Sequence, residues 1–199
     1  AHFDFEFAHY ARPWNGEVRA LSQCIKRLHS LKSLRVSLND TNVITDDGLG
    51  FLAEALHTSQ LLYLDLIASD CPNLIKLEEF SKYLGKISNL KQLKLSLKSC
   101  RKFSNDGLVL LGLSLGKLTK LQELKLNFSL CPAISDDSLE KLINTLASLG
   151  YLRSLDLTLA FIGNITNNTI IQLGKRAKHL EIFALDISSC HQLHGIGLS

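Results

Sequence analysis

The sequence predicts an α/β solenoid in which about seven parallel strands line one face and helices line the other. Two observations predict it: apolar residues alternate between two spacings, and this alternation recurs about every 30 residues. Segment 121–149 shows both spacings. Apolar residues occupy every second position from Leu124 to Phe128, as in a strand with one buried face. From Leu139 to Leu149 they step by three or four, as along one side of a helix.

A strand pattern, L-x-x-L-x-L-x-L, with Val, Phe, Ile or Ala at a few positions, defines the repeats. Its copies begin at Leu31, Leu61, Leu90, Leu121, Leu152 and Leu180. A seventh strand is expected at the start, where Phe3, Phe5 and Phe7 fall 31 residues before the matching positions of the next strand. Residues 193–198 match residues 44–49 of an earlier repeat. Both ends are therefore expected to cut through a longer array.

Short polar triplets mark where several helices are expected to begin. They are Thr45-Asp46-Asp47, Ser104-Asn105-Asp106, Ser135-Asp136-Asp137 and Thr166-Asn167-Asn168. A hydroxyl can accept a hydrogen bond from a free amide of the first turn, and carboxylates favour the positive end of the helix dipole. The aspartate pairs could instead be acid–base pairs or metal ligands. We interpret them as helix caps because they recur at the same place in the repeat.

One strand–helix unit of this size cannot bury both of its apolar faces, so neighbouring units must stack around a continuous core. Helices need more width than parallel strands, which lie about 4.8 Å apart. The stack is therefore expected to be a right-handed superhelix with a curved sheet on the concave face and helices on the convex face. Residues 1–199 are expected to form this single array, and the lack of methionine indicates a piece of a longer chain.

The composition indicates a folded domain that requires neither a membrane nor a nucleic acid. The chain is 46% hydrophobic and 21% charged, and its net charge is only +3, with basic and acidic residues intermixed. No apolar run reaches the roughly 18 residues of a membrane-spanning helix, and no signal-like leader opens the sequence. A basic groove for RNA is disfavoured because aromatic residues do not interleave with the lysines.

These features resemble the leucine-rich repeat family over essentially the whole chain. Repeats near 30 residues, with helix starts such as Gly48-Leu49-Gly50-Phe51-Leu52 and Gly107-Leu108-Val109-Leu110-Leu111, are similar to its long, ribonuclease-inhibitor-like class. The third strand leucine is similar to arrays common in proteins of ciliated protists. The resemblance implies a non-catalytic module that binds protein partners or acts as a scaffold within a larger assembly.

Four of the five cysteines occupy one slot of the repeat, five residues after the second strand leucine. They are Cys71, Cys100, Cys131 and Cys190. The slot corresponds to the family's asparagine or cysteine position, which the resemblance places inward, against loop backbone groups. A disulfide or soft-metal site is the alternative, but the lack of a C-x-x-C pair and the odd total favour a buried, reduced ladder. Cys24 is expected in the core, and Cys190, His191 and His194 are interpreted as an ordinary loop.

Reduced thiols favour a cytoplasmic location, with the cytoskeleton or a cilium as candidate sites. Four glycosylation sequons, which begin at Asn39, Asn127, Asn164 and Asn167, are the argument for a secreted protein. Asparagine, serine and threonine are plentiful here, so several such triplets are expected by chance. We therefore expect a cytoplasmic protein.

No catalytic motif is evident, and we expect no enzyme, no cofactor, no metal and no small-molecule substrate. Segment 112–119 loosely resembles a phosphate-binding loop, but its glycines are one residue too close and leucine replaces the hydroxyl residue. The family resemblance leaves two alternative functions. A GTPase-activating protein of the Ran type would use loop asparagine and arginine residues and acidic extensions that we cannot place here. A ubiquitin-ligase substrate receptor is the other, but no F-box-like segment accompanies this chain.

The residues between the inward leucines are expected to form the partner-binding concave face. One row reads Asp4, Arg35, Asp65, Lys94, Lys125, Asp156 and Ala184, and the next reads Glu6, Ser37, Ile67, Ser96, Asn127, Thr158 and Asp186. The candidate binding residues are Arg35, Tyr63, Asp65, Lys91, Lys94, Lys98, Lys125, Asn127, Arg153 and Asp156. Arginine and tyrosine are frequent binding hot spots. The alternatives are a merely solvated face, whose exposed ion pairs contribute only ~0–1 kcal/mol each, and binding through helices or loops.

One further expectation concerns the only tryptophan. Trp14 lies in the segment that follows the first strand, and we expect it to pack over the open end of the array rather than to serve as an exposed binding anchor.

Overall fold

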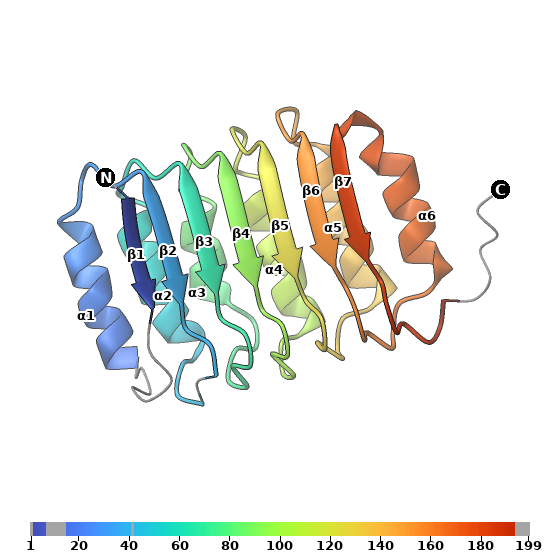
Figure 1. Cartoon of the computed structure of the whole chain (residues 1–199), viewed down its shortest axis with the longest axis horizontal. Coiled ribbons are helices and arrows are strands. Elements are labelled where there is room, and N and C mark those ends of the chain that lie inside the picture. Colours follow the sequence, from blue (N-terminus) through green and yellow to red (C-terminus); the bar gives the residue numbers. More distant parts are fainter. Residues whose placement is uncertain (1, 7–14, 41, 194–199) are drawn as a thin grey trace.

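The computed structural model describes residues 2–6, 15–40 and 42–193, in which strands and helices alternate (Figure 1). The strands are β1 (His2–Glu6), β2 (Ser33–Ser37), β3 (Tyr63–Ile67), β4 (Gln92–Ser96), β5 (Glu123–Asn127), β6 (Ser154–Thr158) and β7 (Ile182–Asp186). The helices are α1 (Asn15–Lys26), α2 (Asp46–Leu56), α3 (Glu78–Leu84), α4 (Asn105–Leu115), α5 (Asp136–Ala147) and α6 (Asn167–Arg176). A short 3₁₀ turn, η1 (Ala177–His179), follows α6. Phe7, Trp14 and segment 194–198, which includes His194, lie outside the described residues.

The seven strands form one parallel sheet in the order of the sequence, from β1 to β7. In Figure 1 each strand runs down the front of the molecule, α2 to α5 lie behind the sheet, and α1 and α6 lie at its left and right ends. The next strand then lies to the right, so every crossover is right-handed, as is nearly universal for parallel strands. The chain therefore folds as an α/β leucine-rich-repeat solenoid, which confirms the predicted fold class.

The core is continuous along the array because equivalent apolar residues of successive repeats pack on one another. The inward strand row contains Leu34, Leu64, Leu93, Leu124 and Leu155, all buried. Phe103 and Phe128 come from successive repeats and stack with their ring centroids 5.7 Å apart. Each repeat thus covers the apolar side of its neighbour, as expected for a solenoid.

The helices begin where the polar triplets predict. Thr45, Ser104, Ser135 and Thr166 are the N-cap residues of α2, α4, α5 and α6. The Ser104 hydroxyl accepts a hydrogen bond from the Gly107 amide at 3.2 Å, and the Thr166 hydroxyl accepts one from the Asn168 amide at 3.2 Å. These bonds confirm side-chain capping at α4 and α6.

The capping interpretation is incomplete for the residue after the caps of α2, α4 and α5, because its side chain reaches into the next repeat. Asp46 accepts hydrogen bonds from the amides of Ile75 and Lys76, at 2.8 and 2.9 Å. Asn105 accepts one from the amide of Ser135 at 3.1 Å. These residues therefore tie adjacent repeats together, a role that a pattern within one repeat does not reveal.

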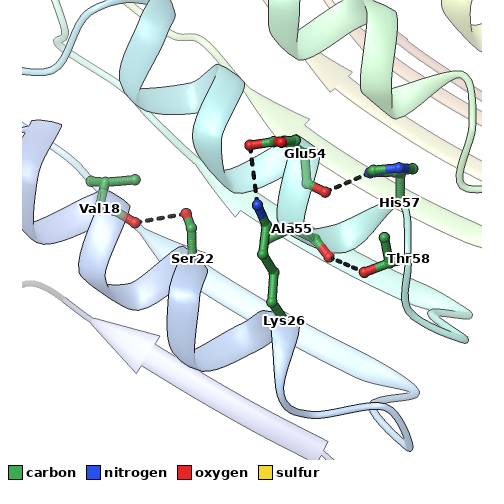
Figure 2. Close-up of polar contacts among 7 residues, drawn as sticks. All are labelled: Val18, Ser22, Lys26, Glu54, Ala55, His57 and Thr58. Carbon is green, nitrogen blue, oxygen red and sulfur yellow. Dashed lines mark hydrogen bonds and ion pairs between the residues drawn. The ribbon is translucent and has the colours of Figure 1, made fainter.

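Helices α1 and α2 pack side by side at one end of the array, with polar contacts at their outer edge (Figure 2). Lys26 of α1 pairs with Glu54 of α2 at 3.3 Å, and the Ser22 hydroxyl donates to the Val18 carbonyl at 2.7 Å. Cys24 was expected in the core but is exposed. It misses the inward stripe of α1 because that stripe repeats every three or four residues and ends at Ile25.

Within residues 2–6, 15–40 and 42–193, no helix is both long enough and apolar enough to cross a membrane.

Candidate partner-binding surface

The sheet face opposite the helices, here called the strand face, presents the outward side chains of the strands. The strand register places Asp4, Arg35, Asp65, Lys94, Lys125, Asp156 and Ala184 side by side in one row. It places Glu6, Ser37, Ile67, Ser96, Asn127, Thr158 and Asp186 in the next. Both rows are those expected from the sequence. A third row contains His2, Ser33, Tyr63, Gln92, Glu123, Ser154 and Ile182.

Most charges of the central row are paired with one another. Arg35 lies 3.5 Å from Asp65, and Lys125 lies 2.9 Å from Asp156. Lys94 stands between these two pairs, with Asp65 on one side and Lys125 on the other. Among the described residues, no carboxylate forms an ion pair with Lys94. The face therefore carries an unpaired positive charge near its middle.

Two hollows meet at Lys94. The first has a volume of about 210 Å³ and extends from Lys94 over Tyr63 to Arg35. The second has a volume of about 320 Å³ and extends from Lys94 across Lys125 toward Asp156. The Tyr63 side chain is 43% exposed in the first hollow, where its ring is available for contact. The strand face is thus hollowed on both sides of the unpaired Lys94.

Three predicted site residues lie at the edges of the strand face rather than on it. Lys91 and Arg153 immediately precede the segments that form β4 and β6, and Lys98 follows β4. Arg153 pairs with Glu181 at 3.3 Å. The alternation of the sheet ends with each strand, so these residues cannot be assigned to its outward face by spacing alone.

The side chain of Asn127, another predicted site residue, forms hydrogen bonds within the loop that follows β5. Its side-chain oxygen accepts hydrogen bonds from the amide and the hydroxyl of Ser129, at 3.0 and 2.8 Å. Asn39, which follows β2, also bonds to a turn, since its side-chain oxygen accepts a bond from the Ser69 amide of the next repeat at 3.0 Å. These asparagines shape the turns that follow the strands.

The cysteine slot forms a buried row along the array, and none of the five cysteines forms a disulfide. Each buried thiol donates to a backbone carbonyl of the preceding repeat: Cys71 to Leu38 at 3.2 Å, Cys100 to Ala68, Cys131 to Leu97 and Cys190 to Leu159, the last three at 3.1 Å. The thiols therefore contribute hydrogen bonds to backbone carbonyl groups within the array, as buried polar groups generally require.

Burial raises the pKa of Cys100 and of Cys131 to about 12, although backbone hydrogen bonds act in the opposite direction. The thiolate is the reactive and metal-binding form of cysteine, so these residues stay protonated and inert. Among the described residues, no group of three or more His, Cys, Asp or Glu side chains is placed to hold a metal ion.

A thiol titration of the native protein is expected to detect Cys24 rapidly and to leave Cys71, Cys100 and Cys131 unmodified. Cys24 is exposed, whereas the other three are fully buried. Absorbance with a disulfide reagent such as dithionitrobenzoate would count the reactive thiols before and after urea unfolding, which should expose all five. Fast reaction of several thiols in the folded protein would contradict the buried ladder.

The turns after the strands contain exposed apolar residues that sequence reasoning missed. In six repeats one residue of this turn has a left-handed backbone: Asp40, Asp70, Ser99, Leu130, Phe161 and Ser189, with φ between 56° and 61°. Leu130 and Phe161 are 38% and 55% exposed. A left-handed conformation costs about 1–2 kcal/mol for a non-glycine residue. The sequence signal for these exposed residues was that Leu130 and Phe161 are apolar at a turn position where the other repeats have aspartate or serine.

On the helix side a groove lies between α2 and α3. Basic side chains of the protein itself already contact the aromatic rings and one of the carboxylates that line it. Arg19 lies 5.3 Å from the centre of the Phe51 ring, and Lys86 lies 4.8 Å from that of Tyr83. Lys82 pairs with Glu79 at 2.9 Å. The strand face, with its unpaired Lys94, is therefore the better candidate for partner binding.

No family model and no curated protein matches this sequence. Solved structures similar to it include a chain of the Rad7–Elc1 complex from yeast, with a TM-score of 0.46 and 13% sequence identity. The match covers 94% of this chain and 63% of that chain, so this chain spans less than two thirds of the other's length. A likeness this distant carries no argument about function, and the fold rests on the strand register described above.

Proposed function

We propose that this chain is a non-catalytic module that binds a protein partner through its strand face, within a larger assembly. The observation that carries the proposal is the position of Lys94, which is unpaired and lies where two hollows of the face meet. A partner carboxylate placed there would gain a charge-assisted hydrogen bond. Tyr63 and Arg35 beside it are residue types that often dominate binding energy.

The hydrogen bonds between successive repeats support a recognition role. Inter-repeat hydrogen bonds of Asp46, Asn105 and Asp136 run along one side of the stack, and the cysteine row runs through it. A partner that binds such a preorganised surface loses little free energy to ordering of the module.

The pKa shifts of Asp136, Cys100 and Cys131 do not point to a general acid or base among these three residues. A general acid or base works best with a pKa near the working pH. Hydrogen bonds hold the pKa of Asp136 below its ordinary value, and burial raises those of Cys100 and Cys131 to about 12, so these shifts lead away from neutrality. A GTP hydrolysis assay with candidate small GTPases would reveal a GTPase-activating function instead.

The remaining details are part of the same proposal. We propose a cytoplasmic location, with the cytoskeleton or a cilium as candidate sites, which is supported by five cysteines without a disulfide. We also propose membership of the long, ribonuclease-inhibitor-like class with cysteine-bearing repeats, similar to arrays of ciliated protists. Repeat length and the cysteine row support this assignment.

Replacing both Lys94 and Lys125 with glutamate is expected to abolish partner recovery. The substitutions reverse the charge of the second hollow and set a new carboxylate beside that of Asp156, where like charges repel. Partners of the native chain would be captured by cross-linking and identified by mass spectrometry, with wild type and variant in parallel. The matched control replaces Lys141 and Lys175, both exposed on helices, with glutamate. Equal recovery by the strand-face variant would mean that the partner binds elsewhere.

A further inference from the structure

We propose that the partner is recognised through an acidic, extended segment that lies along β4. The proposal rests on the function proposed above and names the chemistry of the ligand. It concerns five basic residues, here called the basic stripe: Lys91, Lys94, Lys98, Arg101 and Lys102. They run along β4 and its two flanking loops.

The basic stripe is a concentration of charge within a nearly balanced protein. Between Leu90 and Ser104 the sequence contains these five basic residues and no acidic residue, whereas the whole chain has a net charge of only +3. Elsewhere in the described chain, ion pairs link neighbouring charges of the sheet and helices, as between Arg35 and Asp65. Within the described residues, no member of the stripe forms an ion pair.

The stripe runs along the length of β4, from the loop before this strand to the loop after it. Lys91 precedes β4, Lys94 lies in the middle of the strand face, and Lys98, Arg101 and Lys102 follow β4 in the loop that leads to α4. The last three are exposed, and Lys91 and Lys94 are half-buried. An extended chain laid along β4, the light green strand of Figure 1, would lie over Lys94 and pass the two loops that carry the other residues of the stripe.

The acidic residues nearest the stripe do not neutralise it. Asp65 is paired with Arg35, Asp156 with Lys125 and Asp106 with Lys76. Asp70 and Glu123 lie in the adjoining repeats, and neither forms an ion pair with a described lysine or arginine. Asp70 lies beside Lys98 after β4, and Glu123 lies beside Gln92 at the start of β4.

Carboxylates suit this surface better than a nucleic acid. Proteins that bind single-stranded nucleic acids interleave aromatic side chains with their basic residues so that successive bases can stack. On the strand face near Lys94, Tyr63 is the one exposed aromatic residue among those described. Separate basic residues on a strand and in its two flanking loops instead match the spaced carboxylates of an extended acidic peptide.

The test uses a fluorescein-labelled oligoglutamate peptide of about ten residues, long enough when extended to cover β4 and both flanking loops. Fluorescence anisotropy would measure its binding to the wild-type chain, to Lys94→Glu and to the double variant Lys98→Glu/Arg101→Glu. The matched controls are Lys141→Glu and Lys141→Glu/Lys175→Glu, which change net charge equally on the helix side. Labelled glycine–serine peptide and oligo-dT of similar length would serve as comparison ligands.

We expect the wild-type chain to bind oligoglutamate but not the glycine–serine peptide. Each stripe variant should weaken binding about tenfold or more, and the helix controls should change it less than about twofold. High salt should weaken it too, since at about 1 M charges are screened over roughly 3 Å. No oligoglutamate binding, equal losses in the controls, or stronger binding of oligo-dT would each overturn the inference. The cross-linking experiment with the Lys94→Glu/Lys125→Glu variant tests separately whether a partner binds the strand face, whatever the result with oligoglutamate.

Discussion

Replacing Phe128 with alanine is expected to lower the free energy of unfolding by about 3–5 kcal/mol. The side chain is fully buried and stacks on Phe103 of the preceding repeat, with ring centroids 5.7 Å apart and an interplanar angle of 5°. The two repeats are also joined by parallel strand pairing between β4 and β5, which limits collapse of the cavity. Urea unfolding followed by far-ultraviolet circular dichroism would measure the loss.

The control for this prediction is Leu113→Ala on α4, a residue that is 58% exposed. It should change the unfolding free energy by no more than about 0.5 kcal/mol. Because Phe103 and Phe128 share one contact, the double alanine variant should cost less than the sum of the two single variants. A Phe128→Ala cost as small as that of the control would show that the repeats do not share a packed core at this point.

Replacing Asp136 with alanine is expected to cost about 2–3 kcal/mol of stability. Its carboxylate accepts hydrogen bonds from the Thr166 amide at 3.0 Å, from the Thr166 hydroxyl at 2.6 Å and from the Thr169 hydroxyl. Thr169 is only 1% exposed, so the variant would leave a buried hydroxyl without its acceptor. The neighbouring Asp137 is exposed, and Asp137→Ala should have little effect in the same urea titration.

The contribution of Asp136 should also depend on pH. Burial raises the pKa of this carboxyl, but the hydrogen bonds from Thr166 and Thr169 outweigh burial and lower the pKa below its ordinary value of 3.8. A group with a lowered folded-state pKa stabilises the protein above its unfolded pKa, and this stabilisation is lost as the pH falls through the folded pKa. The difference between wild type and Asp136→Ala should therefore be constant above about pH 5 and shrink below about pH 4. A difference that grows on acidification would contradict these bonds.

Much of the fold could be predicted because a solenoid depends on local periodicity. Strand and helix spacings, each repeated about every 30 residues, specify the alternation of elements, and the strand motif shows which residues of successive repeats are equivalent. The rows that contain Arg35, Asp65 and Lys94 follow directly. Cys24 was wrongly expected in the core because its position was judged by residue type rather than by the stripe of α1.

The candidate site could be predicted only in outline. Spacing along the chain was enough to specify the solenoid, its strand rows and the common slot of the four buried cysteines. The folded structure was needed to show that Arg35 pairs with Asp65, that Lys94 remains unpaired and that Asp136 joins two repeats. Sequence spacing cannot predict these pairings because a charged side chain in a parallel sheet has a neighbouring strand on each side. The length and rotamer of the side chain decide which neighbour it pairs with.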